Sequence, residues 1–339
     1  MSIVSVLPAA TKLASVLGLA SGCALEPAPV PLTTESAVSA PSVVASPPPP
    51  APRAACVPPS GDDRASLVCH RWACDRADLS AATWGGDPGS CAAGDVDVDA
   101  QARALRAINT YRFLAGVREV ALEPEWNGAA QDCALVAHAN GKLSHAPPPS
   151  WACWSPRAAS ASAVSLIANR SAPVAIDAFV ADGGNEDTMV HRRWLLNQRV
   201  RRLGLGSTSR YGCVVVDGRA FDPPGVKPEP DALAPALYEA WPPAGPVPVD
   251  ALAETRVDVV GWTVQSSSAD LDDARVEVTS SGRALPVETF PLARTLGSLS
   301  AIRFVPRGWA TEAGARYEVR VVSREASIAF TVEPIACGA

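Results

Sequence analysis

Histidine is the side chain best suited to proton transfer and metal binding near neutral pH, and it is scarce in this chain. Four occur among 339 residues: His70, His138, His145 and His191. His191 stands in the stretch GNEDTMVHRRWLLN, between an acidic turn and two arginines. A histidine in that setting can bind a metal ion, act as a general base, or hold a loop by hydrogen bonds. Which role applies depends on the helices, strands and loops that position this histidine.

Cysteine is the second residue type whose pattern could carry chemistry. Residues 1–23 resemble an export signal, with Lys12 before a short apolar run and small residues leading to Cys23. We predict a lipoprotein signal peptide whose lipid is attached to Cys23; an ordinary secretory signal that contains a cysteine is the alternative. The protein is then exported, as an outer-membrane-anchored lipoprotein or an extracellular protein.

Eight of the nine cysteines remain once Cys23 is set aside, an even number that predicts four disulfides in an oxidising compartment. We expect Cys133 to pair with Cys153, twenty residues further on, and Cys213 to pair with Cys337. A zinc site built on Cys69 and Cys74 is the alternative. No CxxC motif supports it.

The formal net charge of −6 disfavours partners with a phosphate backbone, so no nucleic acid is expected. No later apolar stretch has the roughly 18 residues that a transmembrane helix requires. Membrane contact is therefore expected only through the N-terminal lipid.

Composition divides the rest of the chain into five segments. A Pro/Ala-rich linker is predicted at 24–55, a cysteine-rich region of disulfide-stapled loops at 56–95, and a mainly helical block at 96–222. A proline-rich connection follows at 223–250. Valine-rich runs with turn residues at regular intervals then predict an all-β sandwich at 251–339.

Four helices are expected in the helical block, over residues 96–116, 123–143, 172–182 and 188–196. Pro124 suits a first turn, while Gly116 and Gly141 suit helix ends. After the fourth helix the hydrophobic period changes, and two runs around Ser207-Thr208-Ser209 predict a hairpin.

Three stretches of this block resemble the CAP superfamily of cysteine-rich secretory, antigen-5 and pathogenesis-related proteins. They are ALRAINTYRFLAGVREVALEPEWNGAAQDCALVAHANGKLSH, AIDAFVADGGN and HRRWLLNQRVRRLGLG. The resemblance, of the bacterial CAP-domain lipoprotein type, implies an α-β-α sandwich. The fold class expected for the whole chain is α+β, with a C-terminal all-β sandwich following the CAP domain.

The resemblance also implies a cleft lined by two histidines and two acids. His145 and His191 match the histidines, and Asp182 matches the acid that closes the third helix. Ser165, in VSLIAN, stands where the family has its other acid. We expect the two histidines and Asp182 to converge and to bind Zn²⁺ or another divalent cation weakly, with Ser165 nearby. Histidines that are purely structural are the alternative.

Residues near these positions have simpler expected roles. Trp151 and Trp154 could form an aromatic wall for an apolar or sugar ligand, or pack over their own loop. Arg192 and Arg193 are expected to reach carboxylates or solvent. His138 is expected at the surface and His70 in a loop.

The function implied by the resemblance is extracellular binding of a lipid, a sterol or another cell-envelope component through the histidine-lined cleft. Two alternatives remain. One is a metal-dependent hydrolase using His145 and His191, which the missing acid disfavours because it would have been the general base. The other is a structural or adhesive envelope protein with no active cleft.

Overall fold

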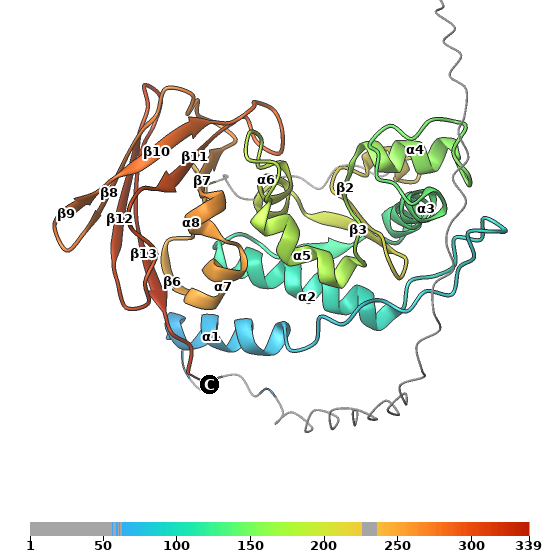
Figure 1. The fold of residues 1–339 in the computed structure, drawn as a ribbon, viewed down its shortest axis with the longest axis horizontal. Coiled ribbons are helices and arrows are strands. Elements are labelled where there is room, and N and C mark those ends of the chain that lie inside the picture. Colours follow the sequence, from blue (N-terminus) through green and yellow to red (C-terminus); the bar gives the residue numbers. More distant parts are fainter. Residues whose placement is uncertain (1–55, 57–58, 60, 62, 226–235, 339) are drawn as a thin grey trace, which may run out of the picture. The chain divides into compact units, whose positions relative to one another are not determined.

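The computed structural model describes residues 56, 59, 61, 63–225 and 236–338, which belong to one compact unit spanning Ala54–Ala339 (Figure 1). Cys23 and the linker predicted at 24–55 lie outside the described residues. The helices are α1 Arg64–Asp75, α2 Val98–Leu114, α3 Pro124–Asn140, α4 Pro156–Ala163, α5 Ala172–Ala181, α6 Val190–Leu196, α7 Val249–Glu254 and α8 Val257–Val260, with a 3-10 turn at Arg219–Phe221. Within the described ranges, none of these helices combines the length and apolar character needed to cross a membrane.

The first sheet holds the strands β1 Ala121–Leu122, β3 Arg202–Ser207, β4 Gly212–Val215 and β2 Ser165–Ala168, in that order. Helix α3 packs on one face, where Trp126, Cys133 and Cys213 belong to a small core. Helices α2 and α5 pack on the other (Figure 1). The expected α-β-α sandwich is confirmed.

Strand β3 lies unusually close to α3 because it carries glycine at the contact points. A Cβ atom built on Gly204 would lie 2.4 Å from the backbone of Trp126. One built on Gly206 would lie 2.1 Å from the backbone of Ala130. Any larger residue at either position would push the helix off the sheet.

The four helices predicted from the sequence are present. Asp97 caps α2 by accepting a hydrogen bond from Asp99 N, and Pro124 opens α3. Gly141 ends α3 in the left-handed conformation, with φ of 62°. The predicted hairpin is formed by β3 and β4, which pair antiparallel on either side of the Ser-Thr-Ser turn.

Two segments were predicted wrongly, and a third was not predicted. The cysteine-rich region, expected to be loops, contains α1, which Asp63 caps and which packs on α2 through Arg64 and Arg71 over the ring of Phe113. Its cysteine content masked the helical pattern. Helix α4 and strand β2 were not predicted. The proline-rich interval 223–250 supplies two strands of the C-terminal sheets, β5 and β6.

The C-terminal part contains two sheets. One has the order β10-β11-β7-β5 and the other β6-β13-β12-β8-β9. Their bounds are β5 Glu239–Trp241, β6 Gly245–Pro248, β7 Trp262–Ser266, β8 Arg275–Ser280, β9 Arg283–Leu285, β10 Val287–Pro291, β11 Ser300–Pro306, β12 Tyr317–Val322 and β13 Ser327–Ile335. The rings of Trp262 and Tyr317 meet between the sheets, with centroids 5.8 Å apart. The part is not purely β as expected, because α8 lies in it directly before β7.

One hydrophobic core continues from the CAP-like sandwich into the C-terminal sheets. It includes Phe179 of α5 together with Phe304 of β11. The rings of Tyr111 in α2 and Trp241 in β5 lie 5.3 Å apart, edge to face. Burying such rings is among the larger contributions to a core. The two parts therefore depend on each other for packing.

All eight described cysteines form disulfides, as predicted, but the expected pairs were wrong. The bonds are Cys56–Cys74, Cys69–Cys337, Cys91–Cys153 and Cys133–Cys213. Helix α3 buries Cys133 against β4, where Cys213 lies, whereas Cys153 belongs to a partly exposed loop. Cys133 therefore pairs with the cysteine that its face of α3 packs against, and not with the cysteine nearest to it along the chain.

Candidate functional site

The centre of the predicted site is a pair formed by Asp182 and His191. Helix α5 ends at Ala181, and Asp182 follows it in the left-handed conformation with φ of 58°. Its side chain is 0% exposed, and Oδ1 lies 2.9 Å from His191 Nδ1. Oδ2 accepts hydrogen bonds from the backbone N–H groups of His191 at 2.9 Å and Arg192 at 3.1 Å. Asp182 thus orients the histidine and also caps α6, because Met189 at the N-cap offers no side-chain bond.

His145 lies in the exposed loop after α3 and is held in a similar way. Its Nδ1 is 2.9 Å from the carbonyl oxygen of Ser162 near the end of α4. A carbonyl oxygen only accepts, so Nδ1 carries the proton and Nε2 keeps its lone pair. The same reasoning applies to His191, whose Nδ1 faces a carboxylate. In the neutral form of each ring, Nε2 is then the acceptor, the state in which histidine binds hydroxyl groups or metal ions.

The residues do not fit a site with three metal ligands. Within the described ranges, no three side chains of histidine, cysteine, aspartate or glutamate are grouped so that they could hold an ion. Asp182, expected as a ligand, has both oxygens occupied by hydrogen bonds behind His191. Ser165 is buried in β2, where its hydroxyl donates to the carbonyl of Ala161 at 2.7 Å. The expected convergence on one ion is therefore wrong for Asp182, and binding of a cation by the two histidines stays a prediction.

The loop that follows His145 is stabilised from within. Trp154 Nε1 donates to the carbonyl of Pro147 at 3.0 Å, and the backbone N–H of Trp151 donates to that of Pro148 at 3.0 Å. The disulfide from Cys153 to Cys91 ties the loop to the segment before α2. These contacts support the packing role, and contact of Trp151 and Trp154 with a ligand stays a prediction.

The other two histidines lie in places that the sequence did not indicate. His138, expected at the surface, is half-buried between the rings of Trp84, 4.8 Å away, and Tyr211, 5.8 Å away, and is only partly exposed. Burial lowers its pKa. His70 lies on α1, with Nδ1 3.6 Å from the sulfur of Cys74, and not in a loop.

Arg192 and Arg193 reach neither the carboxylates nor the solvent expected for them. Arg192 donates to the carbonyl oxygens of Val180 at 2.6 Å and Gly261 at 2.8 Å. Arg193 donates to the carbonyl of Ala293 at 2.6 Å and the hydroxyl of Ser298 at 2.9 Å. Both are 1% exposed, and burial lowers the pKa of each to about 10. The two arginines join α6 to the C-terminal sheets.

A third buried arginine, from α2, holds the end of α6 and the segment that follows it. Arg112 of α2 donates to the carbonyl oxygens of Leu195 at 2.6 Å, Asn197 at 3.0 Å and Val200 at 3.0 Å. Burial lowers its pKa to about 9. Most residues around His191 thus join α6 to its neighbours, whereas His191 itself is partly exposed.

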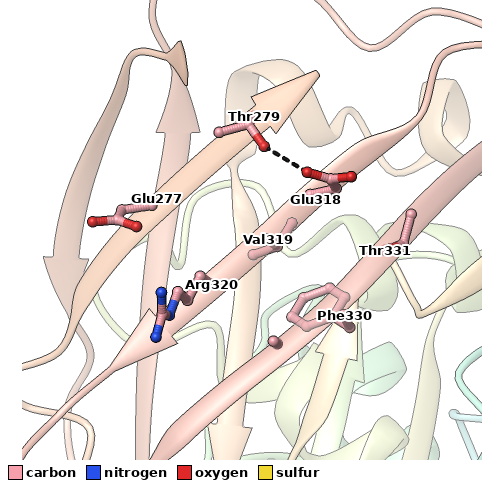
Figure 2. A pocket seen from close by; sticks show the side chains of 8 residues that line it. Glu277, Thr279, Glu318, Val319, Arg320, Phe330 and Thr331 are labelled. Carbon is pink, nitrogen blue, oxygen red and sulfur yellow. Dashed lines mark hydrogen bonds between the residues drawn. The ribbon is translucent and has the colours of Figure 1, made fainter. Parts of the chain in front are cut away.

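Hollows in the described surface lie elsewhere. One, of about 410 Å³, lies over strands β8, β12 and β13, where Thr279 donates a hydrogen bond of 3.0 Å to Glu318 (Figure 2). Its other labelled side chains include Glu277, Arg320 and Phe330, and none belongs to the predicted site. A larger hollow lies near the end of α6 and has Trp194 in its wall. Neither hollow is lined by His145 or His191.

Comparison with known proteins gives one match. The family model of CAP, the cysteine-rich secretory protein family, matches residues 105–216. No curated protein and no solved structure matches the chain. The matched range includes most of α2 and extends to the end of the hairpin, so it contains His145, His191, Asp182 and Ser165. The chain therefore carries a CAP domain of the cysteine-rich secretory protein family, over residues 105–216.

Proposed function

We propose that this is an exported CAP-domain protein that acts as a binding module outside the cytoplasm, attached to the membrane by a lipid on Cys23. The observation that carries the proposal is the pairing of eight cysteines into four disulfides. Such bonds persist in oxidising compartments and are rare in the cytosol.

The binding surface proposed is the one around His145 and His191. Each ring is fixed through Nδ1, and the ring of Phe179 packs edge-on against His191 with centroids 5.0 Å apart. Two fixed Nε2 acceptors suit the hydroxyl group of a sterol or lipid, or of another envelope component. Trp151 and Trp154 supply apolar area beside His145. Asp182 supports this surface from behind by orienting His191.

Binding to vesicles tests this proposal. Full-length protein carrying Cys23→Ser, which removes the proposed lipid, is mixed with phosphatidylcholine vesicles with and without cholesterol. We expect co-sedimentation that depends on cholesterol and falls in His145→Ala, because one acceptor is lost. Lys142→Ala, an exposed change three residues away, is the matched control. Equal sedimentation of all three proteins contradicts a role for His145.

The lipid anchor is tested separately. Mass spectrometry of membrane-extracted wild-type protein is expected to show a diacylglyceryl group on Cys23. An unmodified cysteine at that position would contradict the anchor and leave the binding proposal standing.

A structural or adhesive envelope protein is the second candidate function. The bonds of Asp182 favour it, because its carboxylate caps α6 and orients His191 and so has a structural role. This candidate predicts that the double change His145→Ala and His191→Ala leaves surface attachment unchanged.

A further inference from the structure

A groove of about 620 Å³ lies at the junction between the CAP domain and the C-terminal sheets. Its walls come from the end of α6, the segment leading into β3, the segment after β4 and the loop between β10 and β11. Its volume is in the range of small-ligand sites, which often form where two domains meet. Neither His145 nor His191 lines it, so it is separate from the surface proposed above.

The charges that line the groove are mostly positive. Four arginines border it, Arg199, Arg201, Arg202 and Arg219, against a single carboxylate, Asp217. This is notable in a chain whose formal net charge is −6. A positive cleft with low-dielectric walls attracts anionic ligands.

Two of these arginines are fixed by carboxylates, which sets the position of their guanidinium groups. Arg202 forms ion pairs with Asp222 at 2.9 Å and Glu123 at 3.0 Å. Arg219 pairs with Asp217 at 2.6 Å. Arg199 is exposed, and no ion pair of it is found among the described residues. Arg199 is therefore the cation best able to take a new anionic partner.

An aromatic surface stands beside these charges. Trp194 of α6 is half-buried, packs on the core and also lines the groove. The facing loop is held close to it, because a Cβ on Gly297 would lie only 2.9 Å from Trp194 N. Gly297 has φ of 80°, which glycine adopts without strain. The wall that carries Trp194 is thus firmly placed.

We propose that this groove binds an acidic oligosaccharide. The apolar face of a sugar ring packs on Trp194, and the sugar carboxylate pairs with Arg199 in the two-pronged geometry that guanidinium groups favour. Hydroxyl-bearing residues of the wall, Ser267 and Thr295 among them, suit the many hydroxyl groups of a sugar better than the backbone of an acidic peptide.

Calorimetry on the full chain with Cys23→Ser provides the test. The probes are a trimer of galacturonic acid and the neutral trimer of galactose. We expect the acidic trimer to bind at least about tenfold more tightly, the effect of one hydrogen bond to a charged group. Arg199→Ala should weaken its binding by a similar factor, and added salt should weaken it further. Arg324→Ala, at an exposed arginine paired with Asp273 on the C-terminal sheets, should change nothing.

A second variant, Trp194→Phe, separates stacking from charge. It is expected to weaken both trimers while the protein stays folded, because a smaller ring still fills the half-buried position. Equal affinity for the two trimers, no effect of Arg199→Ala, or equally tight binding of a tetraglutamate peptide would each overturn the proposal. His145→Ala should leave trimer binding intact, so failure here is distinguishable from failure of the proposed function.

Discussion

Asp182 takes part in both helices that meet at the predicted site. It ends α5, and its carboxylate caps α6 and orients His191. The sequence was sufficient to place Asp182 and His191 together, since both match positions of the CAP family. It could not show that Oδ2 accepts from the backbone N–H groups of His191 and Arg192 while Oδ1 lies against His191 Nδ1, because those contacts depend on the path of the turn between the helices.

Replacing Asp182 with asparagine tests this role. We expect Asp182→Asn to lower the free energy of unfolding by about 1–3 kcal/mol, because an amide N–H group would face the N–H groups that the carboxylate now accepts. Denaturant unfolding followed by circular dichroism measures it. Asp63→Asn is the control, since Asp63 caps α1 at the surface and asparagine caps equally well. Equal losses in the two variants would contradict the special role of Asp182.

Glu239 is the second residue whose environment has consequences. It is buried on β5, directly opposite Gln265 of β7 in the antiparallel register. One oxygen of each side chain, Glu239 Oε2 and Gln265 Oε1, lacks a hydrogen-bond partner among the described residues. Both residues border a hollow of about 10 Å³ shared with Arg192 and Arg193. A protonated carboxyl could donate to the amide oxygen, whereas a carboxylate leaves two acceptors facing each other.

Burial raises the pKa of Glu239 to about 7, although hydrogen bonds from Gln198 and the charges of Arg112 and Arg199 act to lower it. The folded protein therefore holds this proton more tightly than the unfolded chain does. The stabilisation that comes from this tighter binding is complete below pH 4.5, the ordinary pKa of a glutamate side chain. It is lost as the pH rises through about 7, the pKa in the folded protein.

We expect Glu239→Gln to remove a pH dependence of about 2–3 kcal/mol in the free energy of unfolding between about pH 5 and pH 8. The quantity to compare is the difference between wild type and variant at each pH, measured by urea unfolding. Glu318→Gln, at an exposed position on β12, should leave the wild-type profile unchanged. If the free energy of unfolding changes with pH in the same way in wild type and Glu239→Gln, the raised pKa of Glu239 is refuted.

At the scale of elements, α6 acts as a clamp although it has only seven residues. Its bounds were close to those predicted, because the Trp-Leu-Leu run marks a buried face. The partners of Arg193 could not be predicted, because Ala293 and Ser298 lie 100 and 105 residues further along the chain. Charged residues on a short helix are usually solvated, and only the packing of the C-terminal sheets buries these.

We expect Arg193→Lys to lower the free energy of unfolding by about 2–4 kcal/mol. Lysine keeps the charge but cannot reproduce the planar set of donors that serves Ala293 and Ser298. Denaturant unfolding is the measurement, with Arg324→Lys as the exposed control. A loss below about 0.5 kcal/mol, typical of a surface change, would show that the clamp contributes little.

The missed elements share a physical cause. Helix α1 was hidden by its cysteines, β5 by the prolines that follow it, and β6 by its own prolines, which normally disfavour sheet interiors. In β6, which pairs parallel with β13 at the end of its sheet, Pro246 and Pro248 are tolerated because an edge strand has one side without ladder partners. For these three elements, local composition gave the wrong prediction because contacts with distant parts of the chain stabilise the helix and the strands.

At the scale of the whole molecule, the shared core predicts one unfolding event for the CAP domain and the C-terminal sheets. We expect a single calorimetric transition whose calorimetric and van't Hoff enthalpies agree. Tryptophan fluorescence and far-UV circular dichroism should give the same midpoint. Two separate transitions would mean that the contacts of Tyr111 with Trp241 do not couple the two parts.

The pairing of the cysteines is checked by a peptide map under non-reducing conditions, which should link Cys69 to Cys337. In the chain-entropy model, closing a loop of 268 residues stabilises the fold by about 5 kcal/mol at most. Cys69→Ser with Cys337→Ser should therefore lower the melting temperature markedly while the other three bonds remain. A map that joins Cys337 to Cys213 would contradict the described connectivity.

The Cys69–Cys337 bond turns nearly all of the described chain into a covalent ring, with Cys91–Cys153 and Cys133–Cys213 as chords across it. A protease that nicks one exposed turn, such as the one at Gly282 between β8 and β9, opens the ring without releasing a fragment. The nicked molecule keeps its full mass on a gel until a reductant is added. Wherever proteases are common and reductants are scarce, the first cut would leave every piece attached.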